Sequence, residues 1–177
     1  MVSTFSNNPK LALNITEFIA GFNAVELTLY QAFGILLGDK DGKLVEVILS
    51  KIDSAAYKQN VVFDTARLQS PDDPLAQSLL DAEPIVKQAT KMRNELAHGI
   101  FALDEHGNIA MINHVFSFGK KPLQSRIIDR QDIVKLNQKL LDKMLAVNIT
   151  MGAKGVKLHG GIITAKMRTE HRDEDAA

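Results

Sequence analysis

Apolar residues recur every three or four positions from Ile15 to Leu37, which is the spacing of one face of an amphipathic α-helix. Asn14 is positioned to cap the start of this helix, with Glu17 as its reciprocal partner, and Gly38 can end it in a left-handed conformation. Glu26 lies beside the apolar stripe. We therefore expect its carboxylate to face a polar partner inside the protein.

Helical spacing continues after a turn at residues 39–42. From Leu44 to Leu68 it is uneven and predicts two short helices, with Ser54 placed to cap the second. The next loop, Ser-Pro-Asp-Asp-Pro, ends with Asp73 as a cap and Pro74 at a first helical position.

The longest remaining helical segment follows this loop and ends at His98, with Gly99 as its terminator. Pro84 falls within the segment. Proline has no N–H and crowds the preceding turn, so it predicts a kink or a new helix start there. The segment from Pro84 to His98 is expected to be one helix.

The pattern changes after Gly99. Residues 100–103 and 108–112 flank a glycine-containing turn and predict two short strands, to which segments 114–118 and 125–128 can add. A last helix is expected after Asp129. Beyond it the chain is rich in glycine and lysine and ends in an acidic run, which predicts a flexible or partner-dependent tail.

These elements predict a mainly α protein: an up-and-down helical bundle with a small β-hairpin insertion. The single domain is expected over residues 1–150, with the hairpin at about 100–128 and the tail over 151–177. A length of 177 residues suits one domain with a substantial core.

The composition of the chain excludes some classes of function. Lys plus Arg (21) equals Asp plus Glu (21), so a nucleic acid partner would have to be held by a local patch of charge. The absence of cysteine excludes a disulfide framework, a thiolate zinc site and a cysteine nucleophile. The N-terminus does not resemble a signal peptide, and no stretch is expected to be long and apolar enough to span a membrane. The sequence therefore predicts a cytoplasmic protein with no membrane partner.

Candidate chemistry is concentrated in residues 93–99, Arg-Asn-Glu-Leu-Ala-His-Gly. Arg93 is a permanent cation, and His98 belongs to the residue type that titrates near neutral pH. A histidine can take the proton of a ribose 2′-hydroxyl or protonate the leaving 5′-oxygen. A guanidinium can hold the non-bridging phosphate oxygens as charge develops on them. The pair therefore suits phosphodiester cleavage with no metal and no other cofactor.

Helix geometry separates these two side chains within one chain. Residues five apart differ by about 140° around a helix, so Arg93 and His98 are not neighbours, whereas Asn94 and His98 share a face. If two copies of the helix met at a two-fold axis, both sets of Arg93, Asn94 and His98 would gather in one cleft. The spacing therefore favours a homodimer formed through this helix.

The phrase Met-Arg-Asn-Glu-Leu-Ala-His-Gly, containing Arg93-Asn94-x-x-x-His98, resembles the signature of the HEPN family (higher eukaryotes and prokaryotes nucleotide-binding domains). Members are all-helical bundles, commonly dimeric, and many are metal-independent ribonucleases of toxin–antitoxin, abortive-infection and CRISPR defence systems. The resemblance covers about residues 14–145. It implies that Arg93 and His98 are catalytic and that Asn94 and Glu95 support them.

The resemblance also implies RNA as the substrate and a cognate antitoxin or inhibitor as a further partner. The predicted hairpin departs from the family pattern, because many members continue as helix after the histidine. Some members lack nuclease activity. A non-catalytic nucleotide- or protein-binding dimerisation module is therefore the alternative, in which Arg93 pairs with a carboxylate and His98 caps the helix end. A metal site is not expected: His98, His106 and His114 recur every eight residues, but no carboxylate pattern frames them.

Overall fold

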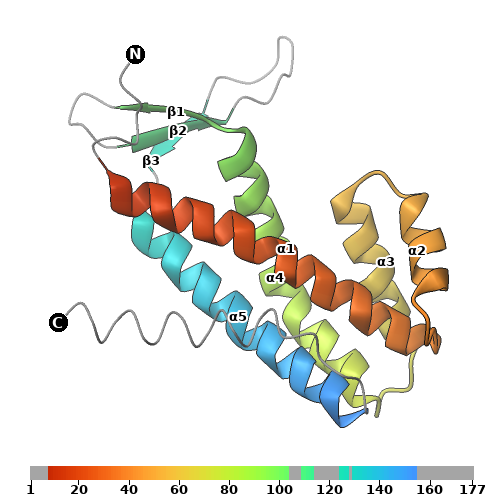
Figure 1. Cartoon of the computed structure of the whole chain (residues 1–177). Helices are drawn as coiled ribbons and strands as arrows, with labels where there is room; N and C mark the ends of the chain where they lie inside the picture. Colours follow the sequence, from red (N-terminus) through yellow and green to blue (C-terminus); the bar gives the residue numbers. More distant parts are fainter. Residues whose placement is uncertain (1–7, 104–108, 114–123, 128, 155–177) are drawn as a thin grey trace.

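The computed structural model describes residues 8–103, 109–113, 124–127 and 129–154 (Figure 1). The helices in these ranges are α1 (Pro9–Leu37), α2 (Lys43–Ser50), α3 (Ala55–Arg67), α4 (Pro74–His98) and α5 (Arg130–Ala153). The strands are β1 (Ile100–Leu103), β2 (Ile109–Asn113) and β3 (Gln124–Ile127).

The helices pack as a bundle in which α4 contacts α1, α3 and α5. The three long helices α1, α4 and α5 lie alongside one another, and α2 and α3 cover one end of α1 (Figure 1). The predicted mainly α bundle is confirmed. Its core comes from the apolar stripes of these helices, and the largest fully buried side chains are Phe18, Phe22, Phe33, Phe63, Leu11, Leu29, Leu75, Leu79, Ile133, Leu140 and Met144.

Helix α1 begins earlier than its apolar pattern predicts. The Oδ1 atom of Asn8 accepts a hydrogen bond from the Leu11 N–H at 3.1 Å, and Pro9 occupies the first turn. The prediction that Asn14 caps this helix is wrong. Asn14 lies inside α1, where its Oδ1 accepts a hydrogen bond from Arg130 Nε at 2.7 Å and so links α1 to the start of α5. Gly38 ends the helix with φ 68°, the predicted left-handed conformation.

Helix α1 is also the one described helix that is long and apolar enough, by length and composition alone, to cross a membrane. The expectation that no stretch meets this standard is therefore wrong for α1. Its buried side chains pack within the bundle, where α1 contacts α3, α4 and α5. The apolar composition of the helix thus serves the core of the protein in this structure.

Helix α4 runs without a break from Pro74 to His98, so the start predicted at Pro84 does not occur. Pro84 is exposed to solvent. Water can replace the hydrogen bond that proline cannot donate, and the packing of α4 against three other helices holds the turns on either side together. Gly99 ends α4 in an extended conformation (φ −70°, ψ 148°), so the backbone passes directly into β1.

The strands form an antiparallel sheet in the order β1-β2-β3. Ile100 pairs with Ile112, and Met111 pairs with Arg126. The strand predicted over residues 114–118 and the tail from residue 155 onward lie outside the described residues. Helix α5 extends to Ala153, so the first residues of the predicted tail belong to the bundle.

Asp73 connects the start of α4 to the end of α5. Its Oδ1 accepts hydrogen bonds from the N–H groups of Leu75 (2.9 Å) and Ala76 (3.0 Å), as the sequence predicted for a cap. Its Oδ2 accepts one from Lys154 Nζ at 2.6 Å. The bond from Lys154, followed by the two backbone bonds, holds the pKa of the Asp73 carboxyl below its usual range.

Replacing Asp73 separates these two roles. Asp73→Ala removes the cap and the ion pair and is expected to lower the free energy of unfolding by about 1–2 kcal/mol, whereas Asp73→Asn keeps a capping oxygen and loses less. Because the folded pKa of Asp73 is lowered, the contribution of its charge is present above the unfolded pKa and disappears as pH falls through the folded pKa. The stability difference between wild type and Asp73→Asn should therefore shrink toward low pH, as measured by urea unfolding. A difference that is constant with pH would contradict this.

Candidate functional site

The motif residues occupy the end of α4, next to the sheet. His98 is exposed, Asn94 is exposed and Arg93 is half-buried. Arg93 Nη1 donates a hydrogen bond to Asn94 Oδ1 at 3.1 Å. The Nε atom of Arg93 is buried, and no group in the described ranges accepts a hydrogen bond from it. The guanidinium therefore retains hydrogen-bonding capacity that no group in the described ranges uses.

Arg93 interacts electrostatically with α1. Glu26, half-buried on α1, has a raised pKa because burial disfavours its charged form, and the positive charges of Arg93 and Lys58 oppose that shift. Positive charges on both α3 and α4 thus act on this carboxylate, which is consistent with the polar surroundings expected for Glu26. Tyr30, one turn further along α1, has a raised pKa from burial and from the neighbouring Glu26 charge.

One chain does not bring Arg93 and His98 together. Because α4 is continuous through residue 98, the two side chains keep their separation of about 140° around the helix. Arg93 acts electrostatically on Glu26 of α1, while His98 shares its face with Asn94. Neither side chain lines either of the cavities described next. Glu95 is half-buried and lines the cavity between α3 and α4.

This cavity has a volume of about 390 Å³. Its polar lining comes from Gln59 and Asn60 on α3 and from Lys87, Thr90, Lys91, Asn94 and Glu95 on α4. Gln59 is 2% exposed, and its Oε1 accepts a hydrogen bond from the Thr90 hydroxyl at 2.8 Å. The Nε2 atom of Gln59 is buried without a hydrogen-bond partner in the described residues. The cavity therefore contains a buried amide that is only half satisfied.

The sequence analysis did not single out Gln59 or Thr90, although both leave a signal. Gln59 occupies the buried face of α3, at helical spacing from Val62, Phe63 and Ala66. Thr90 likewise lies on the buried part of α4, next to Ala89. A polar residue at a core position predicts a buried hydrogen bond, but only the fold shows that these two meet.

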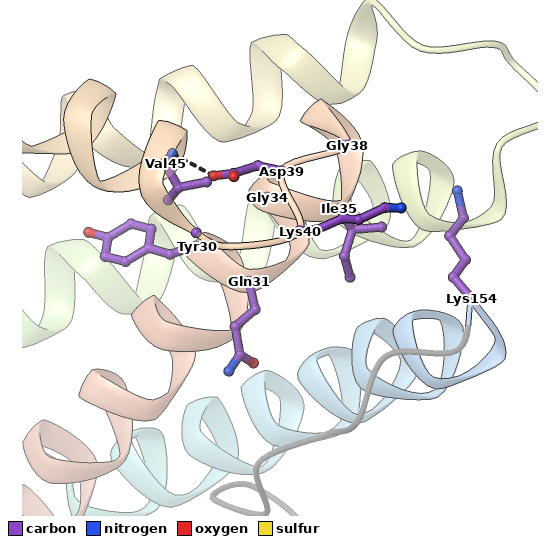
Figure 2. Close-up of a pocket in the computed structure, with 10 residues that line it drawn as sticks. Tyr30, Gln31, Gly34, Ile35, Gly38, Asp39, Lys40, Val45 and Lys154 are labelled. Atoms are coloured by element: carbon purple, nitrogen blue, oxygen red, sulfur yellow. Dashed lines mark hydrogen bonds between the residues drawn. The ribbon is translucent and has the colours of Figure 1, made fainter.

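A larger cavity of about 670 Å³ lies at the other end of the bundle (Figure 2). It is bounded by the end of α1, the turn before α2, and Lys154 at the end of α5. The Val45 N–H donates a hydrogen bond to Asp39 Oδ2 at 2.9 Å, drawn as the dashed line in Figure 2, which holds the turn against α2. Since Lys154 pairs with Asp73 at the start of α4, this cavity is remote from Arg93 and His98.

Metal ligands are not grouped in the described ranges: no three His, Asp or Glu side chains there are arranged to hold an ion. His106 and His114 lie outside those ranges.

The chain was compared with protein-family models, with curated proteins and with solved structures, and none of the three comparisons gave a match. The site is therefore interpreted from its own residues.

The effect of the Arg93 charge on the pKa of Glu26 can be tested without an activity assay. Arg93→Gln removes a positive charge that lowers the Glu26 pKa, so that pKa is expected to rise further, as followed by NMR of the side-chain carboxyl carbon. Arg93→Lys keeps the charge and should leave the pKa of Glu26 close to the wild-type value. An unchanged pKa in Arg93→Gln would show that the guanidinium does not face this carboxylate.

Proposed function

We propose that the protein is a metal-independent endoribonuclease of the HEPN type, acting in the cytoplasm as a homodimer. The observation that supports this most is the state of the motif at the end of α4. His98 is exposed there, and Arg93 is bonded to Asn94 while its Nε has no partner among the described residues. A mainly helical bundle is also the architecture that the motif implies.

In the proposed reaction, the ribose 2′-hydroxyl attacks the adjacent phosphorus and the bond to the 5′-oxygen breaks. His98 transfers the proton, either from the 2′-hydroxyl or to the leaving oxygen, and Arg93 stabilises the charge that develops on the non-bridging oxygens. The products are a 2′,3′-cyclic phosphate and a 5′-hydroxyl. Single-stranded or loop RNA is the expected substrate, because splayed nucleotides can enter a narrow cleft.

The homodimer supplies what one chain lacks. Arg93 and His98 diverge around α4, so a two-fold contact at the end of this helix is the arrangement that would place one chain's Arg93 near the other chain's His98. Such a contact would also concentrate cations in a chain whose formal net charge is zero. A cognate antitoxin or inhibitor is proposed as a further partner, because an unguarded ribonuclease would harm its own cell.

The second candidate is a non-catalytic HEPN-like module that binds a nucleotide or a protein. One observation favours it: Arg93 is half-buried, bonded to Asn94 and electrostatically coupled to Glu26, which is how a structural arginine is held.

Cleavage of total RNA in the presence of a chelator distinguishes the two functions. Wild type is expected to cut the RNA, His98→Ala to lose about 10²-fold or more of the rate, and Arg93→Ala to lose about 10²- to 10³-fold. Lys139→Ala, a change at an exposed cation on α5, serves as the control and should cut normally. Intact RNA with every protein would favour the binding module.

Mixing the two inactive variants tests the shared cleft. Heterodimers of Arg93→Ala and His98→Ala contain one intact arginine and one intact histidine, so part of the activity should return if each site draws on both chains. A mixture that stays inactive, while exchange of subunits is verified by mass spectrometry, would place each site within one chain.

A further inference from the structure

The cavity between α3 and α4 contains an unsatisfied group that the proposed reaction does not use. Gln59 is 2% exposed, and one atom of its amide has no hydrogen-bond partner in the described residues. A buried polar atom without a partner costs free energy, so such atoms are normally paired with protein, water or ligand. Gln59 lines a cavity of about 390 Å³, within the size range of small-ligand sites.

The Gln59 amide suits a ligand that both donates and accepts hydrogen bonds. The Thr90 hydroxyl has one hydrogen and two acceptors within 2.8 Å, Gln59 Oε1 and the Val86 carbonyl oxygen. If that hydrogen goes to Val86, a rotated amide can donate to Thr90 from Nε2 and leave Oε1 as the atom without a partner in the described residues. A ligand that has a hydrogen-bond donor next to an acceptor can therefore bond to the amide in either orientation.

The rest of the lining favours the same class of ligand. Asn60 and Asn94 add two more amides at the cavity, which Glu95 also lines. Lys91 and Lys87 also line the cavity, and Lys87 is already paired with Glu83 at 2.7 Å. Amides recognise the edges of nucleobases, whereas lysines contact phosphates as point charges.

The cavity lies on the face of α4 that leads to His98. Lys87, Lys91, Asn94 and His98 follow one another at intervals of four, three and four residues, which places them in one row along the helix. His98 is one turn beyond Asn94, about 6 Å along the axis. A nucleotide held in the cavity would therefore have its neighbouring phosphate close to His98.

We propose that this cavity binds a nucleobase of the RNA strand, through Gln59, Asn60 and Asn94, and so positions the strand at the motif. The assignment of the strand as substrate rests on the proposed ribonuclease function. The binding of a base does not depend on catalysis and can be measured separately.

Non-cleavable RNA separates the two questions. Short 2′-O-methyl oligonucleotides have no 2′-hydroxyl nucleophile, so they report binding alone. Four homopolymers, an abasic oligonucleotide with the same phosphates, the four nucleoside monophosphates and inorganic phosphate are titrated into the full chain in the presence of a chelator. The side-chain amide signals of Gln59, Asn60 and Asn94 are followed by NMR.

At least one homopolymer is expected to shift these signals, with the abasic oligonucleotide and inorganic phosphate binding about tenfold more weakly or not at all. Gln59→Met should weaken the best homopolymer about tenfold, because the apolar side chain fills the same space without hydrogen bonds. Gln88→Met, the same change at an exposed position of α4, should bind as wild type does. Asn60→Ala, at a half-buried position, repeats the test if Gln59→Met does not fold.

Equal binding of the abasic oligonucleotide would show that the cavity recognises phosphate, and it would overturn the proposal. Binding of monophosphates but of no oligonucleotide would assign the cavity to a free nucleotide and would equally overturn it. Failure of the cleavage assay in the presence of base-dependent oligonucleotide binding would reject the ribonuclease and keep the base site. The two proposals can therefore fail independently.

Discussion

The packing of α4 among α1, α3 and α5 is the constraint on which the rest of the structure depends. Its start is fixed by the Asp73 cap and by contacts with the end of α5, where Ser78 and Thr150 are hydrogen-bonded at 3.0 Å. Its end passes directly into β1 through Gly99. A helix held on three sides and at both ends presents its polar side chains in fixed directions, which is what a binding site needs.

Polar groups enter the bundle at neighbouring positions of this helix. Arg93 acts electrostatically on Glu26 of α1, and Thr90, three residues earlier, bonds to Gln59 of α3. Partly buried charges and amides are costly unless they are paired, so both arrangements restrict how α4 can sit against its neighbours. The guanidinium and the amide each keep one nitrogen without a partner in the described residues.

The positions of these residues around α4 relate the two proposed functions to each other. His98 continues the row that lines the α3–α4 cavity, whereas Arg93 lies outside that row. A substrate bound along the cavity would meet the histidine of its own chain, and the arginine would have to come from a second copy. The two proposed functions differ in the role of Arg93. In the binding module it stabilises its own chain, whereas in the ribonuclease it contributes to the active site of the partner chain. Its bond to Asn94, and an Nε that no described residue accepts from, are compatible with both roles.

Local signals in the sequence determined much of the fold. The apolar periodicity, the Asp73 cap, the start of the last helix after Asp129 and the left-handed Gly38 were all predicted, because each depends on residues within a turn or two. Local signals failed where two competed or where packing outweighed them. Asn8 with Pro9 caps α1 in place of Asn14, and packing on three sides carries α4 through Pro84.

The candidate site likewise has a part that the sequence predicted and a part that only the tertiary structure determined. Arg93, Asn94 and His98 were found from their spacing on one helix, and the same periodicity showed that Arg93 and His98 diverge. Only the tertiary structure decided that the charge of Arg93 acts on Glu26, and that Gln59 and Thr90, 31 residues apart, meet beside a cavity. The physical reason is that helix periodicity fixes the direction of a side chain around its own axis, whereas its partner depends on which helix the whole core places opposite it.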